Sequence, residues 1–283
     1  MIIVDKNYLG GRMLKRHSHT HKGDYGHLLL VCGCDSMPGA AILATGAALK
    51  SGCGLVTLHS TAIAAQAAVG QCPSAMLSID NAPHFSEVPD LAKYTSIGIG
   101  PGLGRNEDTV KAFGILIAAA GALCKPMLLD ADALNIISED RGLLDRIPEG
   151  SVMTPHEGEL KRLVGEWSSD DEKDEKIAAI CRKTGCILVA KGYNTGIFTP
   201  SGDKYVNTTG NPGMAKGGSG DVLAGLVSGL MARGYSALDA ALTGVWVHGY
   251  AGDCLTREYT AEAYNSKDIV GCLYKGFKEL YGV

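Results

Sequence analysis

Short apolar runs alternate with longer segments of helical periodicity along the first two thirds of the chain. Apolar runs of this length predict buried strands, and the alanine-rich or amphipathic segments after them predict helices. We expect strands at residues 28–31, 55–58, 96–99, 127–129, 152–153 and 187–190. We expect helices at 40–51, from 108, and at 133–137, 157–164 and 170–183. This alternation predicts an α/β fold with a mostly parallel central sheet and helices on both faces.

The pattern changes in the last third. Residues 196–199 and 204–206 flank a Pro-Ser-Gly-Asp turn, which predicts a β-hairpin with a longer loop. Residues 222–233 are apolar at helical spacing and Gly234 follows them, which predicts a helix with a glycine stop. Ser236 and Asp239 predict a capping box for another helix. No linker, repeat or low-complexity tract interrupts the chain, so we expect residues 1–283 to form one domain.

Composition and charge narrow the possible functions. The 283 residues are 46% hydrophobic and 20% charged and include 38 glycines, which is typical of a globular protein with many tight turns. The formal net charge of -4 gives no broad basic field, so we expect neither nucleic acid nor a membrane as a partner. The nine cysteines form no Cys-x-x-Cys pair and no secretory signal is present, which favours free thiols and a cytoplasmic location.

The strongest chemical signal is Gly217-Gly218-Ser219-Gly220-Asp221, directly before the expected 222–233 helix. Small residues let backbone N–H groups converge on an anion, and the helix start adds unpaired donors and about half a positive charge. Asp221 is placed to take the proton of an attacking hydroxyl, and the helix start should favour its ionised form. The segment predicts phosphoryl transfer to a small-molecule hydroxyl. A glycine-rich turn with an aspartate at the helix entry is the structural alternative.

Other nucleotide-binding signatures are absent. The glycine-rich segment Gly98–Gly104 does not fit Gly-x-Gly-x-x-Gly, because Leu103 and Arg105 fall where the third glycine belongs. The sequence has no Gly-Lys dipeptide, which excludes a P-loop. The protein-kinase motifs His-Arg-Asp and Asp-Phe-Gly are also missing. Any nucleotide must therefore be held in another way.

Polar residues follow three of the expected strands, at the sheet edge where open α/β folds bind ligands. His156 and Glu159 share one helix face, and either His156 contacts substrate while Glu159 organises a hydrated Mg²⁺, or both are ordinary helix-start residues. Asp130 is the better ligand candidate than Asp132, which can cap the next helix. The segment Lys191-Gly192-Tyr193-Asn194-Thr195 can cradle a phosphate or ribose, or form a plain turn.

Two further groups carry a weaker signal. His17, His19 and His21 alternate, but no Cys or carboxylate stands at ligand spacing, so we expect solvated loop histidines. Cys32 and Cys34 fit buried packing better than redox chemistry.

The order of these motifs resembles that of the ADP/ATP-dependent NAD(P)H-hydrate dehydratases, a branch of the ribokinase-like superfamily. The match runs from about Gly26 to Asp253 and consists of Met37–Ala41, Lys50–Val56, Gly100–Gly104, Asp130–Asn135, Thr154–Glu159, Lys191–Gly192 and Gly217–Asp221. Relatives usually carry Gly-Gly-Ser where this chain has Cys32-Gly33-Cys34. The resemblance implies a ribokinase-like three-layer sandwich. It also implies a stand-alone dehydratase domain, because too few residues precede the first motif for the epimerase domain that relatives often carry.

The resemblance further implies repair of hydrated nicotinamide cofactors. ADP, or ATP, phosphorylates the 6-hydroxyl of (6S)-NAD(P)H hydrate, phosphate leaves, and NAD(P)H is restored. Asp221 would activate the hydroxyl while the amides of Gly218, Ser219 and Gly220 hold the moving phosphoryl group. The hydrate would contact Ala40, Ala41, Gly102, His156 and Asp221, and the adenine nucleotide would contact Lys191, Gly192, Tyr193, Asn194, Thr195 and Gly220. Mg²⁺ and a homotetramer are implied in the same way.

Two other functions remain open on the sequence. A ribokinase-like kinase of a vitamin precursor, such as hydroxyethylthiazole or hydroxymethylpyrimidine kinase, would keep the anion hole but release a stable phosphate ester. A non-catalytic nucleotide-binding or regulatory protein would keep the fold without turnover. Asp221→Asn tests this alternative, because an enzyme should lose turnover while it binds nucleotide nearly as before.

Overall fold

Ten strands of the computed structural model, which describes residues 1–283, form a single sheet. Their order across the sheet is β1-β10-β9-β8-β7-β6-β5-β2-β3-β4. Every neighbouring pair is parallel except β8 with β9 and β9 with β10. The strands are β1 (Ile2–Val4), β2 (His27–Val31), β3 (Leu55–Thr61), β4 (Met76–Asp80), β5 (Ser96–Ile99), β6 (Met127–Leu129), β7 (Val152–Met153), β8 (Ile187–Ala190), β9 (Gly196–Phe198) and β10 (Lys204–Asn207). The predicted mostly parallel sheet and the hairpin are confirmed.

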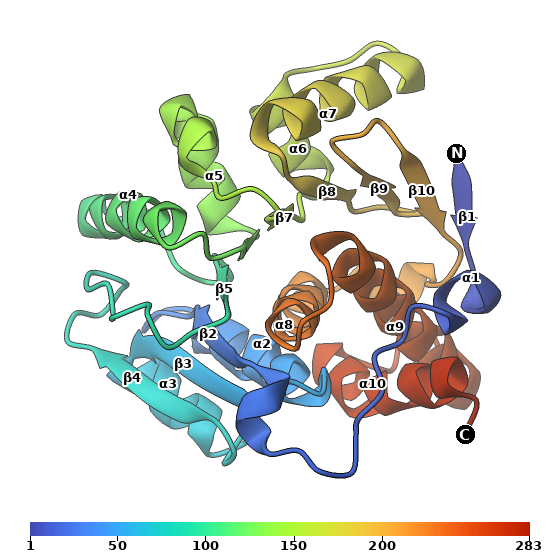
Figure 1. Ribbon diagram of the computed structural model, residues 1–283, viewed down its shortest axis with the longest axis horizontal. Coiled ribbons are helices and arrows are strands. Elements are labelled where there is room, and N and C mark those ends of the chain that lie inside the picture. The colour runs from blue at the N-terminus through green and yellow to red at the C-terminus, as the bar shows by residue number, and fades with distance from the viewer.

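Helices cover both faces of this sheet, as Figure 1 shows. The helices are α1 (Lys6–Gly10), α2 (Pro38–Lys50), α3 (Ala62–Val69), α4 (Glu107–Ala122), α5 (Asp132–Glu139), α6 (Glu157–Val164), α7 (Asp170–Thr184), α8 (Ser219–Ala232), α9 (Ala237–Glu258) and α10 (Ser266–Tyr281). One apolar core joins the sheet to α4, α5, α6 and α7, and two others join the opposite face to α2, α3, α8, α9 and α10. The fold is therefore the expected three-layer sandwich.

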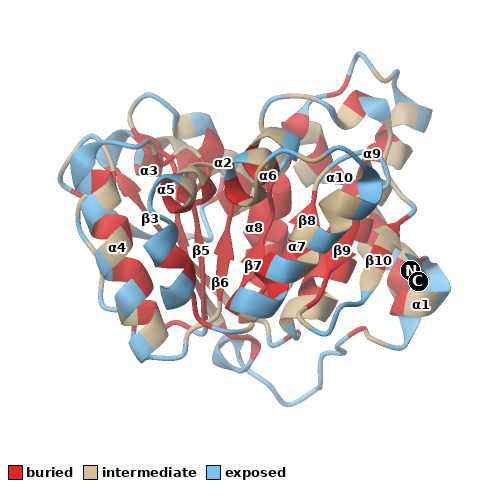
Figure 2. Ribbon diagram, turned by 90° about the horizontal axis from the view of Figure 1, so that it is seen from above, coloured by how far each residue is buried: buried red, intermediate tan, exposed pale blue.

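Side-chain alternation along the strands explains why both faces are buried. Leu29 and Val31 of β2 belong to the core on the α4 side, while Leu28 and Leu30 belong to the core beneath α2. Successive residues of a strand point to opposite faces, so a strand covered on both sides must be apolar throughout. Figure 2 shows these buried strands between helices whose outer faces are exposed.

Helix α8 packs unusually close to α2. A Cβ atom on Gly225 would lie 2.0 Å from the carbonyl oxygen of Ala44, so only glycine allows this approach. About two turns earlier, Gly218 has φ +87°, and a Cβ there would lie 2.3 Å from Cδ1 of Leu43. These contacts fix the first turn of α8 at the edge of the sheet.

Some details differ from the sequence predictions. Helix α8 begins at Ser219, three residues before the expected start. Only half of the expected capping box forms: Ser236 Oγ accepts the Asp239 N–H at 3.0 Å, and it donates to the Asp239 carboxylate at 2.8 Å. The same carboxylate also accepts a 2.6 Å bond from Arg12, so it does not reach back to the amide of Ser236.

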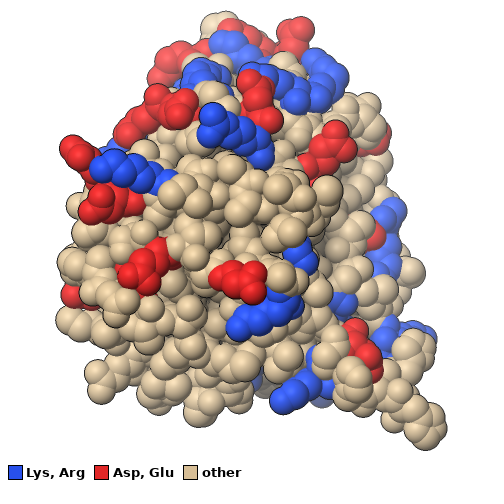
Figure 3. Space-filling model, turned by 60° about the vertical axis from the view of Figure 1, so that its left-hand side comes forward, with Lys and Arg blue, Asp and Glu red and all other residues tan.

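No helix is both long enough and apolar enough to cross a membrane. On the face in Figure 3, basic and acidic side chains are interspersed and no field of one sign covers the surface.

Candidate active site

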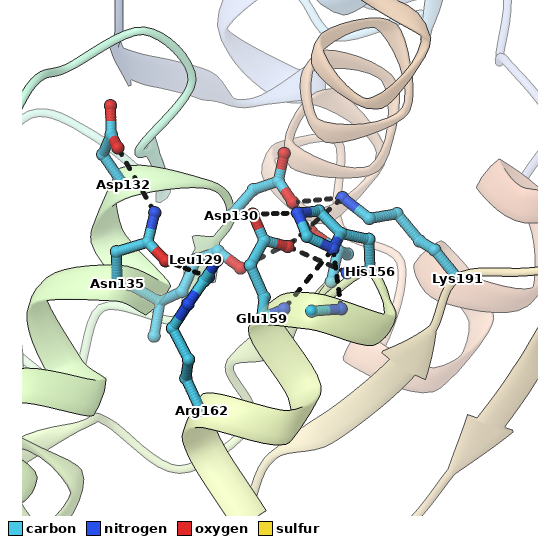
Figure 4. A network of polar contacts seen from close by, with 10 residues as sticks. Leu129, Asp130, Asp132, Asn135, His156, Glu159, Arg162 and Lys191 are labelled. Atoms are coloured by element: carbon cyan, nitrogen blue, oxygen red, sulfur yellow. Dashed lines mark hydrogen bonds and ion pairs between the residues drawn. The ribbon is translucent and has the colours of Figure 1, made fainter. Parts of the chain in front are cut away.

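Three residues that follow neighbouring strands meet at the carboxyl edge of the sheet. Asp130 follows β6, Thr154 follows β7 and Lys191 follows β8. Asp130 is buried, and its Oδ1 accepts bonds of 2.7 Å from Thr154 Oγ1 and 2.7 Å from Lys191 Nζ. Figure 4 shows the ammonium of Lys191 directed at this carboxylate. Asp130 is thus the buried carboxylate of this strand end, whereas Asp132 is partly exposed.

The ammonium of Lys191 is held between two carboxylates. Its Nζ lies 3.9 Å from Glu159 Oε2 as well as 2.7 Å from Asp130 Oδ1. Burial opposes the charged form, but the two carboxylates outweigh it and raise the pKa of Lys191. Lys191 is therefore a fixed positive charge at neutral pH.

The first turn of α8 lies directly against this charged pair. A Cβ on Gly220 would lie 3.3 Å from Lys191 Nζ and 3.9 Å from Asp130 Oδ2. The N–H groups of Gly218 and Gly220 have no acceptor within the protein, whereas Ser219 N–H donates to the carbonyl of Lys216 at 3.3 Å. Two of the three amides predicted to hold the phosphoryl group are therefore free, whereas the Ser219 amide is bonded within the protein.

The carboxyl group of Asp221 has a higher pKa than the sequence predicts. Burial, helped by the charge of Asp130 and opposed by Lys191, raises the pKa of Asp221 to about 6. The expectation that the helix start would favour the ionised form is wrong, because loss of solvent outweighs the helix dipole. A carboxyl with this pKa is well matched to proton transfer near neutral pH.

His156 and Glu159 form the two halves of a capping box at the start of α6. Nδ1 of His156 accepts the N–H of Gly158 at 3.0 Å, and Glu159 Oε2 accepts the N–H of His156 at 2.8 Å. Nε2 of His156 lies 3.2 Å from Glu159 Oε1. Both ring nitrogens are therefore engaged within the protein, although the imidazole is 54% exposed and lines the cleft described below.

The carboxylates of this region suit only a largely hydrated magnesium ion. No group of three or more His, Cys, Asp or Glu residues is arranged to hold a metal. The oxygens of Glu159 contact the capping box and Lys191, while Asp130 Oδ2 accepts no hydrogen bond within the protein. Mg²⁺ in such sites keeps several waters and is shared with substrate phosphates. The residues therefore fit an ion that arrives with a nucleotide.

A cleft of about 700 Å³ opens beside the first turn of α8. Its walls contain every residue predicted to contact the nucleotide, namely Lys191, Gly192, Tyr193, Asn194, Thr195 and Gly220. The segment is also a turn, because Thr195 Oγ1 donates to the carbonyl of Gly192 at 3.0 Å. The two interpretations of this segment are thus compatible.

Two residues predicted to contact the hydrate touch each other, Ala40 in the first turn of α2 and Gly102 in the loop after β5. A Cβ on Gly102 would lie 2.7 Å from the Cβ of Ala40. Ala41 is fully buried and packs against Gly33, so it supports this wall from behind. Asp132 does not cap its helix; its Oδ2 accepts the N–H of Gly104 at 2.9 Å and ties the glycine loop to α5.

Sequence reasoning missed one buried polar group of the cleft. His248 of α9 places Nε2 3.3 Å from Ser219 Oγ, and burial lowers its pKa to about 4, so the ring is neutral. A histidine within the apolar stretch 245–251 of this helix was the available signal. The exposed His17, His19 and His21 lie outside the cleft, as expected for loop residues.

Cys32 lies close to the proposed base. Burial, with a further contribution from Asp221, raises the pKa of its thiol well above the usual value. Cys34 is also buried, and both thiols are free. The expectation of packing in place of redox chemistry agrees with this geometry.

A family model described as NAD(P)H-hydrate dehydratase matches residues 28–274. The chain belongs to this family. An ADP-dependent (S)-NAD(P)H-hydrate dehydratase from Neisseria meningitidis is 38% identical over 85% of this chain and 80% of its own length. The Bacillus subtilis dehydratase of the same name is 33% identical over 93% of this chain and 94% of its own length.

Longer relatives and a solved structure agree with this assignment. A bifunctional NAD(P)H-hydrate repair enzyme from Moorella thermoacetica is 37% identical over 92% of this chain but only 50% of its own length, so the chain spans about half of that relative. The crystal structure of the ADP/ATP-dependent dehydratase from Bacillus subtilis, obtained with ATP and Mg²⁺, has a TM-score of 0.83 and 29% identity. The superposition covers 99% of this chain and 98% of the Bacillus subtilis chain, which confirms the ribokinase-like fold.

Proposed function

We propose that this protein is a nucleotide-dependent NAD(P)H-hydrate dehydratase. The observation that supports it most directly is Asp221, a carboxyl with a pKa of about 6 that shares the first turn of α8 with the free amides of Gly218 and Gly220. A base of suitable pKa, an anion hole and a 700 Å³ cleft meet at one helix start. Family membership supplies the substrate class.

The proposed reaction has two steps. Asp221 takes the proton of the 6-hydroxyl while that oxygen attacks the terminal phosphoryl group of the nucleotide, with ADP giving AMP. The C6–O bond of the phosphate ester then breaks, assisted by the lone pair of the ring nitrogen, and phosphate leaves. Loss of a proton from C5 completes the double bond of NAD(P)H. Gly218 and Gly220 would donate to the transferred phosphoryl group, which is the largest contribution that such a site can make.

The charges around the site also favour a metal-bound nucleotide. Asp130, Glu159 and Asp221 surround the single ammonium of Lys191, so an unaccompanied polyphosphate would meet net negative charge. Mg²⁺ carried by the nucleotide would neutralise it, with Asp130 and Glu159 binding its waters. Lys191–Thr195 and Gly220 would contact the nucleotide, and Ala40, Gly102 and the ring of His156 would contact the hydrate, with Ala41 behind them.

We extend the proposal to ADP as the preferred donor, a cytoplasmic location and a homotetramer. The names of the Neisseria and Bacillus relatives support ADP. Nine free cysteines support a reducing compartment. The single sheet from β1 to β4 supports residues 1–283 acting as one domain. Sedimentation analysis of the purified protein tests the tetramer.

Incubation with ADP, Mg²⁺ and (6S)-NADH hydrate tests the reaction. The near-ultraviolet absorbance of the dihydronicotinamide ring should reappear as AMP and phosphate accumulate. A folded protein that binds ADP but restores no absorbance would refute the proposal, and a stable phosphate ester from a vitamin precursor would favour the kinase alternative. Asp221→Asn should lose turnover by several orders of magnitude and bind nucleotide nearly as before. Parallel reactions with ATP, and with NADPH hydrate, rank the substrates.

A further inference from the structure

Lys216, the residue before the glycine run, has an ammonium enclosed by main-chain carbonyls. Its Nζ donates to the carbonyl of Ala261 at 2.7 Å, of Glu262 at 3.1 Å and of Tyr264 at 2.5 Å. It also lies 4.4 Å from the centre of the Tyr264 ring, within the range of a cation–π contact. An ammonium has three N–H donors, so none remains for a ligand in the cleft.

The carbonyls come from the connection between α9 and α10, far along the chain from the anion hole. This connection and the first residue of α10 make two other contacts with residues 211–217. Ser266 Oγ donates to the carbonyl of Gly217 at 2.7 Å, and Tyr264 Oη donates to Asn211 Oδ1 at 2.9 Å. The ammonium of Lys216 is the only charged group that takes part in these contacts, and the carbonyl of Lys216 accepts the Ser219 N–H at 3.3 Å.

We propose that Lys216 is a positioning residue that acts as an internal monovalent cation and holds the anion-hole loop in its phosphoryl-binding geometry. The inference rests on the proposed function, because it assigns Gly218 and Gly220 to the transferred phosphoryl group. Without the ammonium, three carbonyl dipoles would face one another with no donor between them. The connection would then turn its carbonyls to solvent and release the loop, leaving the free amides misaligned.

A cavity-rescue experiment tests this role. Lys216→Ala removes three methylenes and the ammonium, a fragment that corresponds to propylammonium. We expect kcat/KM for NADH hydrate to fall about 10- to 100-fold, as for other small displacements of catalytic groups. Propylammonium should restore at least part of it with saturable dependence, and the neutral analogue propanol should not. Lys216→Met should show the same loss without rescue, because its side chain fills the space. The exposed Lys267→Met serves as the matched control.

Hydrogen exchange separates this inference from the proposed function. The amides of Ser219 and Val222, which donate to the carbonyls of Lys216 and Gly218, should exchange faster in Lys216→Ala and return towards the wild-type rate when propylammonium is added. If the wild-type protein converted no hydrate, the proposed function would be refuted. The exchange rates would still show whether Lys216 holds the loop in place. Unchanged kcat/KM and unchanged exchange in Lys216→Ala would overturn the inference. A loss that propylammonium does not reverse, or weaker ADP binding with unchanged exchange, would also overturn it.

Discussion

Replacing Asp221 by asparagine should stabilise the folded protein at alkaline pH while it removes activity. The pKa of the carboxyl is about 6 in the folded chain, chiefly because it is buried. In an unfolded chain it would be about 3.9. Between these two values the folded state binds more protons than the unfolded state, so the free energy of unfolding falls as the pH rises. An uncharged amide avoids this loss.

The size of the effect follows from the two pKa values. A difference of about two units corresponds to roughly 3 kcal/mol, and partial exposure of Asp221 makes this an upper figure. The stability gained by Asp221→Asn is then about 0.5 kcal/mol at pH 4 and reaches about 3 kcal/mol at pH 8. For a chain of this length, the gain at pH 8 corresponds to a rise in Tm of roughly 4–8 °C.

Thermal unfolding followed by circular dichroism at pH 5 and pH 8 measures this difference. Asp171→Asn, on the exposed side of α7, is the control and should shift Tm equally at the two pH values. The reasoning is refuted if Asp221→Asn gains no more stability at pH 8 than at pH 5. It is also refuted if the variant is less stable than the wild-type protein at pH 8.

Three further predictions concern activity and packing. The kcat/KM of the wild-type enzyme should fall about tenfold per pH unit below pH 6, because only ionised Asp221 accepts the proton; a profile flat to pH 5 would contradict this. Gly220→Ala should lower kcat/KM with little change in Tm, because its Cβ would press on the buried ammonium. Gly225→Ala should lower the free energy of unfolding by about 1–3 kcal/mol through overpacking against α2. Gly271→Ala is the control for both, since a Cβ there meets nothing within 4 Å and helix propensity should slightly raise Tm. Equal effects of the three alanines would refute the packing argument.

The sequence predicted the strands that are buried on both faces and the helices whose apolar residues recur at a clear helical spacing. Strand β8 and helix α6 have the expected bounds. Strand β4 (Met76–Asp80) was missed because it is an edge strand with mixed exposure, so neither an apolar run nor a clean alternation marks it. Helix α3 (Ala62–Val69) was missed because its alanines give almost no contrast between faces.

The site was predictable as a set of strand ends but not as a set of contacts. That Asp130, His156 and Lys191 gather follows from parallel topology, which brings the carboxyl ends of strands to one edge. The hydrogen bond from Lys191 to Asp130 joins residues 61 positions apart. It depends on the strand order β8-β7-β6, which cannot be read from the sequence. The sign of the pKa shift of Asp221 was wrong for a related reason, since burial is a property of the assembled layers.

The strength of the proposed base depends on helix packing as much as on nearby charges. The start of α8 packs closely on α2 at Gly218, against Leu43, and about two turns later at Gly225, against the backbone of Ala44. This packing removes solvent from the turn that carries Asp221, and burial is the main cause of its raised pKa. The free amides belong to the same turn, so one interface sets both the anion hole and the base. Substitution of the glycines in this interface should therefore change the pH profile of the proposed proton transfer as well as the stability of the fold.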